Sequence, residues 1–117
     1  MSKELLIAVI DDDESFRMAL VDSLGSLGYG ARGFASAEEF IAWEANGSCD
    51  CVITDIHMPG MSGLDLARLL TARRCGVPVV MITARSDWDI DARTICLLKK
   101  PFKTDALIDC LEKALNA

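Results

Sequence analysis

Four short runs of almost unbroken apolar residues restrict the fold of this chain more than any other feature of its sequence. They lie at residues 5–10, 51–54, 77–83 (interrupted by Pro78) and 95–98. A strand that is exposed on one face alternates apolar and polar side chains, whereas a strand covered on both faces is apolar throughout, as in parallel sheets. The runs therefore predict buried parallel strands. A weaker run at 29–34, with glycines at 28, 30 and 33, predicts an edge strand.

Helical patterns occupy the intervals between these runs. In the first interval, apolar residues that include Phe16 and Leu20 recur at three- and four-residue spacing, which places them on the core face of a helix, and Gly28 follows as a stop signal. Residues that can cap the later helices are Ser36, Ser62 and Thr104. The alternation of strands and helices predicts a doubly wound α/β domain with a five-stranded parallel sheet. A length of 117 residues, 51% of them hydrophobic, fits one domain over 1–117 with a substantial core.

Polar residues stand where several of these strands end. Asp11 and Asp12 follow the first strand, Asp55 ends the third, Thr83 ends the fourth, and Lys100 follows the fifth. The carboxyl ends of parallel strands meet at one edge of the sheet, which is where doubly wound domains bind ligands. Converging carboxylates repel one another unless a cation lies among them, and oxygen ligands suit Mg²⁺. The sequence therefore predicts a magnesium site at this edge.

Each of these residues also has an ordinary structural explanation. The acidic segment 11–14 could be a solvated turn that caps the next helix, and Asp55 could be a turn former. Thr83 could be chosen for its β propensity, and Lys100 could be a surface lysine. The placement of one such residue type at each strand end is not predicted by turn and cap chemistry, and this favours a functional site.

Composition restricts the partners of the chain. The formal net charge is −6, which argues against direct binding to nucleic acid or to an anionic membrane. The apolar run at 5–10 is too short to span a bilayer. There are five cysteines, and their spacing matches neither a disulfide framework nor a zinc site. We therefore expect a protein of the reducing cytoplasm with no membrane contact.

Four ordered motifs resemble the receiver domains of two-component response regulators. They are VIDDDESFR at 9–17, VITDIHMPGMSG at 52–63, MITA at 81–84 and KPF at 100–102, and they cover essentially the whole chain. The segment 28–40 further resembles the FixJ-like branch of that family. The resemblance implies a flavodoxin-like sheet with the strand order 2-1-3-4-5.

The resemblance also assigns the acidic residues. It implies that Asp55 accepts the phosphoryl group and that Asp12 and Asp55 bind Mg²⁺ directly. The main-chain carbonyl of His57 would be a third protein ligand, and Asp11 would act mostly through water. A direct role for the His57 imidazole is not implied.

The remaining site residues and the partners follow from the same resemblance. Thr83 would hold a phosphoryl oxygen through its hydroxyl, and Lys100 would pair with the phosphoryl group. The donor would be a phosphohistidine on a sensor histidine kinase. A C-terminal DNA-binding output domain outside this sequence and a homodimer are further implied associations. Such domains catalyse their own phosphorylation and slow dephosphorylation, but they are switches and not turnover enzymes.

Two features depart from the family pattern. The segment from Thr83 to Lys100 is shorter than usual by roughly five residues, more than one helical turn, so the fourth helix is expected to be shortened or disordered. Leu97 stands where many receivers have a switch tyrosine or phenylalanine. Two alternatives stay open: an interaction module of the same fold that works independently of phosphorylation, and a phosphohydrolase of the haloacid-dehalogenase type. The second would need an aspartate where His57 stands.

Overall fold

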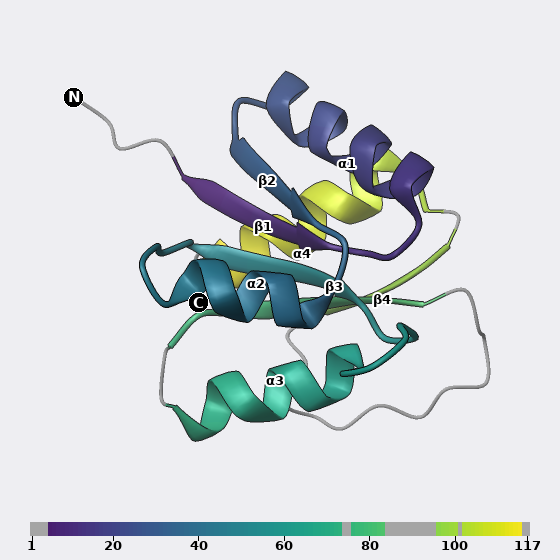
Figure 1. Cartoon of the computed structure of the whole chain (residues 1–117). Coiled ribbons are helices and arrows are strands. Elements are labelled where there is room, and N and C mark those ends of the chain that lie inside the picture. The colour runs from purple at the N-terminus through teal and green to yellow at the C-terminus, as the bar shows by residue number, and fades with distance from the viewer. Residues whose placement is uncertain (1–4, 74–75, 84–95, 101, 116–117) are drawn as a thin grey trace.

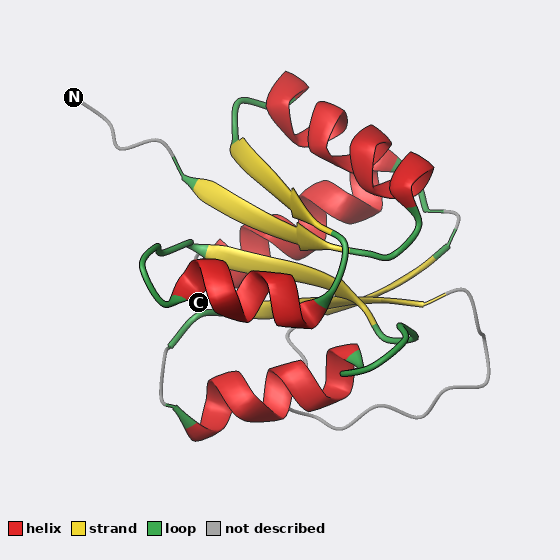
Figure 2. Cartoon of the chain, viewed as in Figure 1, coloured by secondary structure: helices red, strands yellow, loops and turns green. Residues whose placement is uncertain are grey.

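The computed structural model describes residues 5–73, 76–83, 96–100 and 102–115. Within these residues strands and helices follow one another as in Figures 1 and 2. The strands are β1 (Leu6–Ile10), β2 (Gly30–Phe34), β3 (Cys51–Asp55), β4 (Val79–Thr83) and β5 (Cys96–Lys99). The helices are α1 (Glu14–Ser26), α2 (Ala37–Glu44), α3 (Gly63–Ala72) and α4 (Thr104–Leu115). Both sets agree with the predicted alternation, apart from the interval between β4 and β5, which lies outside the described residues.

All four strand pairings in the sheet are parallel. The strand order is β2-β1-β3-β4-β5, which confirms the doubly wound, flavodoxin-like fold. β1 and β3 are neighbours at the centre, and the winding reverses beside β1. Their register pairs Ile10 with Thr54, so the residues that follow β1 lie level with the end of β3.

The sheet separates two apolar cores, which explains the unbroken apolar runs. In β1, Ile7 and Val9 belong to the core shared with α1 and α4. Ala8 and Ile10 belong to the core shared with α2 and α3. Figure 1 shows these two helix pairs on opposite faces of the sheet. Alternate residues of one strand thus face two different apolar environments, and each large aliphatic side chain that is fully buried contributes about 1.5–3 kcal/mol.

Polar side chains cap the N-terminal ends of the first three helices. The Asp13 carboxylate accepts the N–H of Phe16 at the start of α1. Ser36 caps α2, and Ser62 forms a reciprocal capping box with Asp65 at the start of α3. Such caps contribute about 1 kcal/mol each. Ser36 and Ser62 confirm the sequence prediction, whereas Thr104 is the first residue of α4 rather than a residue that precedes it.

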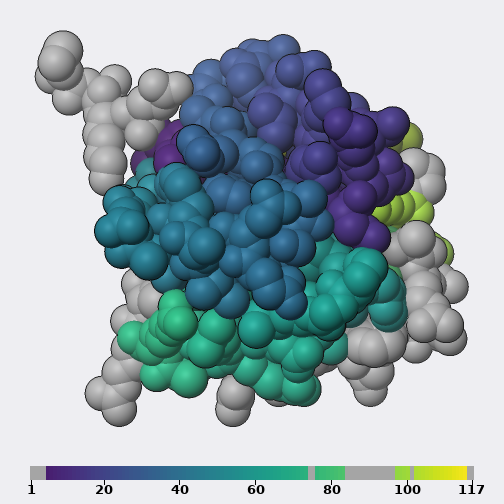
Figure 3. Space-filling model, in the orientation of Figure 1, coloured from purple at the N-terminus to yellow at the C-terminus, as the bar shows by residue number. Residues whose placement is uncertain are grey.

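Gly28 ends the α1 segment in the left-handed region, with φ of +94°, as its position predicted. The segment between β4 and β5, where a shortened fourth helix is expected, lies at 84–95, outside the described residues. No helix in the described part of the chain is long and apolar enough to cross a membrane. In the space-filling view, the segments from α1 to α3 cover most of the sheet from this side of the molecule (Figure 3).

Candidate functional site

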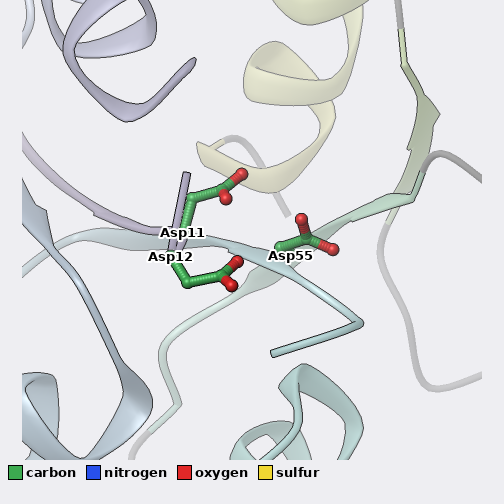
Figure 4. A group of neighbouring side chains, drawn as sticks. All are labelled: Asp11, Asp12 and Asp55. Atoms are coloured by element: carbon green, nitrogen blue, oxygen red, sulfur yellow. The ribbon is translucent and has the colours of Figure 1, made fainter. Parts of the chain in front are cut away.

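Three carboxylates meet at the carboxyl edge of the two central strands (Figure 4). Asp11 and Asp12 follow β1, and Asp55 is the last residue of β3. One oxygen from each carboxylate lies within 4.8 Å of the others. Asp11 and Asp55 are buried, at 1% and 7% exposure, whereas Asp12 is exposed. The predicted convergence of these side chains is therefore confirmed, and solvent reaches the cluster at Asp12.

Lys100 supplies a positive charge to the cluster. Its ammonium lies 3.0 Å from Asp11 Oδ2 and 2.9 Å from Asp55 Oδ2, and its side chain is only 18% exposed. Its main-chain N–H donates to the carbonyl of Thr83 at 2.7 Å, which joins the end of β5 to the end of β4. Lys100 was predicted to pair with a phosphoryl group. In this structure it bridges two carboxylates.

Burial and charge act on these groups in opposite directions. Burial raises the pKa of the Asp11 carboxyl, although the N–H of Asp13 and the ammonium of Lys100 partly offset this effect. For Lys100, burial alone would lower the pKa, but the hydrogen bonds to Asp55 and Asp11 outweigh it and the net shift is upward. The ammonium is therefore held in its charged form between the two carboxylates.

The loop after β3 is held by contacts with neighbouring segments. The His57 N–H donates to Asp55 Oδ1 at 3.0 Å, which orients the carboxylate. Farther along, the Met61 N–H donates to the Glu38 carboxylate of α2 at 3.0 Å. Gly60 between them adopts φ of +75°, a conformation that favours glycine. These contacts fix the path of the loop that carries the carbonyl of His57.

Thr83 lies at the same edge of the sheet. It ends β4, is 1% exposed, and follows Ile82, which is paired in register with Asp55. The Ile56 N–H donates to the carbonyl of Ile82 at 2.9 Å. The structure therefore brings the candidate acceptor, the acidic residues, Thr83 and Lys100 to one edge, as the strand ends predicted.

Several supporting residues were not found by sequence reasoning. Arg17 donates to the main-chain carbonyl of Asp11 at 2.7 Å, and its stem passes over Gly33, where a Cβ would lie 3.1 Å from it. Phe16 was expected only on the core face of its helix, yet its ring contacts Lys100. Arg17 and Phe16 lie in the motif at 9–17, and Glu38 lies in the segment 28–40. Their place in these motifs was the only signal in the sequence that they could support the site, and it did not predict their contacts.

The fold and the site together define a class of protein: a doubly wound α/β domain with a carboxylate cluster and a lysine counter-ion at the switch point of its sheet. The sequence profile of the response regulator receiver domain matches residues 7–112. The chain therefore belongs to the response regulator receiver domain family.

Individual relatives agree with this assignment. The transcriptional regulatory protein FixJ of Bradyrhizobium diazoefficiens is 32% identical over 115 residues, which cover 94% of this chain and 56% of that protein. The structure of the response regulator StyR has a TM-score of 0.89 at 36% identity, over 97% of this chain and 60% of that one. The response regulator TrrA of Thermotoga maritima, in complex with Mg²⁺–BeF, has a TM-score of 0.87 at 30% identity, over 95% and 99%. The chain thus spans about half the length of FixJ.

Proposed function

We propose that residues 1–117 form one receiver unit that accepts a phosphoryl group on Asp55 in a Mg²⁺-dependent reaction. The observation that carries the proposal is the arrangement of three carboxylates around a shared point, with the Lys100 ammonium hydrogen-bonded to two of them. Capping and turn formation require no such lysine, and neither brings carboxylates from two strands together. The phosphorylated unit would then act on an output domain or a partner.

The donor set fits Mg²⁺. Asp12 and Asp55 would hold the ion directly, the main-chain carbonyl of His57 would be a third ligand, and Asp11 would act through bound water. All of these donors are oxygen, which Mg²⁺ prefers, and the exposed position of Asp12 leaves room for the water molecules that it retains. When bound, Mg²⁺ would offset the negative charge of the acceptor and of the incoming phosphoryl group. The TrrA complex with Mg²⁺–BeF supports this choice of ion.

Asp55 would be the nucleophile. One of its carboxylate oxygens forms a bond to phosphorus while the bond between phosphorus and the imidazole nitrogen of the donor breaks. The released imidazole takes up a proton, and the product is an acyl phosphate. The hydrogen bond from the His57 N–H to Asp55 Oδ1 orients the carboxylate, so that the reaction depends mainly on alignment and charge.

Lys100 and Thr83 would bind the transferred group. The Lys100 ammonium already lies 2.9 Å from Asp55 Oδ2, and it would donate to a phosphoryl oxygen after transfer. Thr83 would donate its hydroxyl to another oxygen. Because its main-chain carbonyl accepts the Lys100 N–H, movement of Thr83 would also displace the end of β5. The acyl phosphate would carry a charge of about −1.5 to −2 in place of the single negative charge of the carboxylate, and this added charge would bias the conformation of this edge.

The partners follow from the family. The phosphoryl donor would be a sensor histidine kinase, and the receiver would be a switch rather than a turnover enzyme, with self-catalysed phosphorylation and slow loss of the phosphoryl group. The chain covers only 56% of FixJ, a transcriptional regulator, which supports a DNA-binding output domain outside this sequence. Association as a homodimer and a cytoplasmic location belong to the same proposal.

Intact-mass spectrometry after incubation with acetyl phosphate and Mg²⁺ tests the acceptor. We expect the wild-type protein to gain one phosphoryl group, and to gain none when EDTA removes the ion. Asp55→Asn should gain none. Asp22→Asn is the matched control because Asp22 is an exposed carboxylate in α1, and it should react like the wild type. A phosphoryl group on Asp55→Asn would refute the assignment, and an unmodified wild type that still binds Mg²⁺ would favour a module that works independently of phosphorylation.

A further inference from the structure

The Lys100 ammonium has a third neighbour besides its two carboxylates. Its nitrogen lies 4.1 Å from the centroid of the Phe16 ring. The ammonium has three N–H donors, and two acceptors are the carboxylates of Asp11 and Asp55. The aromatic face therefore takes the remaining side of a group that is only 18% exposed. Little water reaches this contact, so the attraction between the cation and the ring is weakly screened.

Phe16 is itself fixed from two sides. Its N–H is capped by Asp13 at the start of α1. Its ring meets Phe102 edge to face, with centroids 6.0 Å apart and planes at 79°. Phe102 stands two residues after Lys100 in the sequence. The ring thus links the first turn of α1 to the segment that follows β5, and it does so directly beneath the ammonium.

The two kinds of neighbour behave differently when the site changes state. The carboxylates of Asp11 and Asp55 are the groups that a metal ion and a phosphoryl group would engage. Such engagement would weaken or break their hydrogen bonds to Lys100. The Phe16 ring carries no charge and has no part in either event, so its contact with the ammonium can persist.

We propose that Phe16 is a positioning residue for Lys100: its ring holds the ammonium at the site while Asp55 exchanges its lysine contact for the phosphoryl group. This inference rests on the proposed function and assigns a part in it to a residue on α1. Without the ring, the four-carbon stem of Lys100 would be free to leave the site once its carboxylate partners were engaged. The effect is expected on the rate of transfer and not on the binding of Mg²⁺.

A purely structural role for Phe16 is the competing explanation. A cavity of about 190 Å³ borders the ring, and its lining includes Leu20, Phe102 and Leu107. The ring is therefore not tightly enclosed on all sides, and leucine at this position would keep most of the apolar contact while it removes the aromatic face. Phe16→Leu and Phe16→Tyr separate the two explanations, because only the second variant keeps the ring.

The experiment measures the rate of phosphorylation by acetyl phosphate at saturating Mg²⁺, together with the Mg²⁺ dissociation constant by calorimetry. We expect Phe16→Leu to slow the reaction on the order of tenfold, the scale of a desolvated cation–π contact, with the dissociation constant near that of the wild type. Phe16→Tyr should restore the rate. Equal rates in the wild type and Phe16→Leu would overturn the proposal, as would a Phe16→Tyr variant as slow as Phe16→Leu.

A second readout does not depend on phosphorylation. The Phe16 ring current should shift the side-chain protons of Lys100 upfield in the NMR spectrum of the protein, with Mg²⁺ absent and with Mg²⁺ bound. Phe16→Leu should remove this shift. If the wild type cannot be phosphorylated, the function proposed above fails, and the shift still reports whether the ring retains the ammonium once the metal is bound. Loss of the shift on addition of Mg²⁺ to the wild type would overturn the proposal even if the acceptor assignment held.

Discussion

Gly63 is the position at which a single added methyl group should most disturb the proposed acceptor site. Gly63 is the first residue of α3, and its N–H donates to the carbonyl of Ile56 at 3.0 Å. A Cβ at this position would overlap the main-chain carbonyl oxygen of Asp55 and lie 3.0 Å from Ile56 Cα. These neighbours are backbone atoms, so they cannot turn away as a side chain can. Gly63→Ala must therefore move α3 away from the end of β3.

The size of the effect follows from these contacts. Overpacking against a fixed neighbour costs about 1–3 kcal/mol, and loss of the hydrogen bond to Ile56 costs about 1 kcal/mol more. The better helix propensity of alanine offsets about 1 kcal/mol of this cost. The net loss is about 1–3 kcal/mol in the free energy of unfolding. With an unfolding entropy of about 0.25 kcal/mol/K for a chain of this length, the melting temperature should fall by roughly 4–12 °C.

Thermal and urea unfolding followed by circular dichroism measure this loss. Gly25→Ala is the control because Gly25 lies in α1, where a Cβ would meet nothing within 4 Å. There alanine should be neutral or stabilising by up to about 1 kcal/mol. Equal stability of Gly63→Ala and Gly25→Ala would refute the predicted clash. A retained melting temperature with slower phosphorylation would also contradict it, because the steric argument requires both to change.

Substitutions at four further positions test other parts of the structure. Leu24→Ala removes a side chain with 0% exposure and should lower the unfolding free energy by about 2–5 kcal/mol in urea; a loss below 1 kcal/mol would contradict the packing described. Burial raises the pKa of Asp11, so its ionised form favours the unfolded chain. The contribution of Asp11 to stability is complete below the pKa of an unfolded aspartate, about 3.9, and it is lost as pH rises through the pKa in the folded protein. Without divalent ions Asp11→Asn should therefore melt higher than the wild type at pH 7, and the difference should shrink as pH falls; a difference independent of pH would contradict this. Glu38→Ala should speed hydrogen exchange of the Met61 amide, whereas Glu38→Gln should preserve protection; equal exchange in the two variants would argue against the tie between α2 and the loop. Lys100→Met should bind Mg²⁺ more tightly in calorimetry, because a positive charge leaves the cluster, yet accept phosphoryl groups more slowly; weaker Mg²⁺ binding would contradict the electrostatic argument.

The fold could be predicted from the sequence because burial on both faces of a strand leaves a direct record in residue type. The runs at 5–10 and 51–54 correspond to β1 and β3 within one residue at each end. The run at 77–83 began too early, since β4 begins at Val79, just after Pro78, whose nitrogen has no hydrogen to donate to a ladder. The predicted helix before β5 belongs to 84–95 and stays a prediction.

The site could be predicted only as far as topology determines it. Parallel strands place their carboxyl ends at one edge, so the convergence of Asp11 and Asp55 follows from their positions alone. The bridge from Lys100 to Asp11 spans 89 residues of sequence. Whether an ammonium meets one carboxylate, two or an aromatic face depends on side-chain directions across three elements. No periodicity in the sequence records those directions, and for this reason Phe16 was predicted only as a core residue.

The charge of Lys100 connects the resting state of the site to its proposed reaction. Three carboxylates at close quarters would destabilise the fold, and one ammonium cannot neutralise all three. The cluster therefore stays negative and attracts a divalent cation, while the bridge to Asp11 and Asp55 keeps the two buried carboxylates paired until that cation arrives. Mg²⁺ and the Lys100 ammonium would compete for the carboxylate of Asp55. After its release from Asp55, the ammonium would remain near the transferred phosphoryl group only if a neighbour other than a carboxylate kept it there. In this chain the Phe16 ring, with its centroid 4.1 Å from the ammonium nitrogen, is such a neighbour.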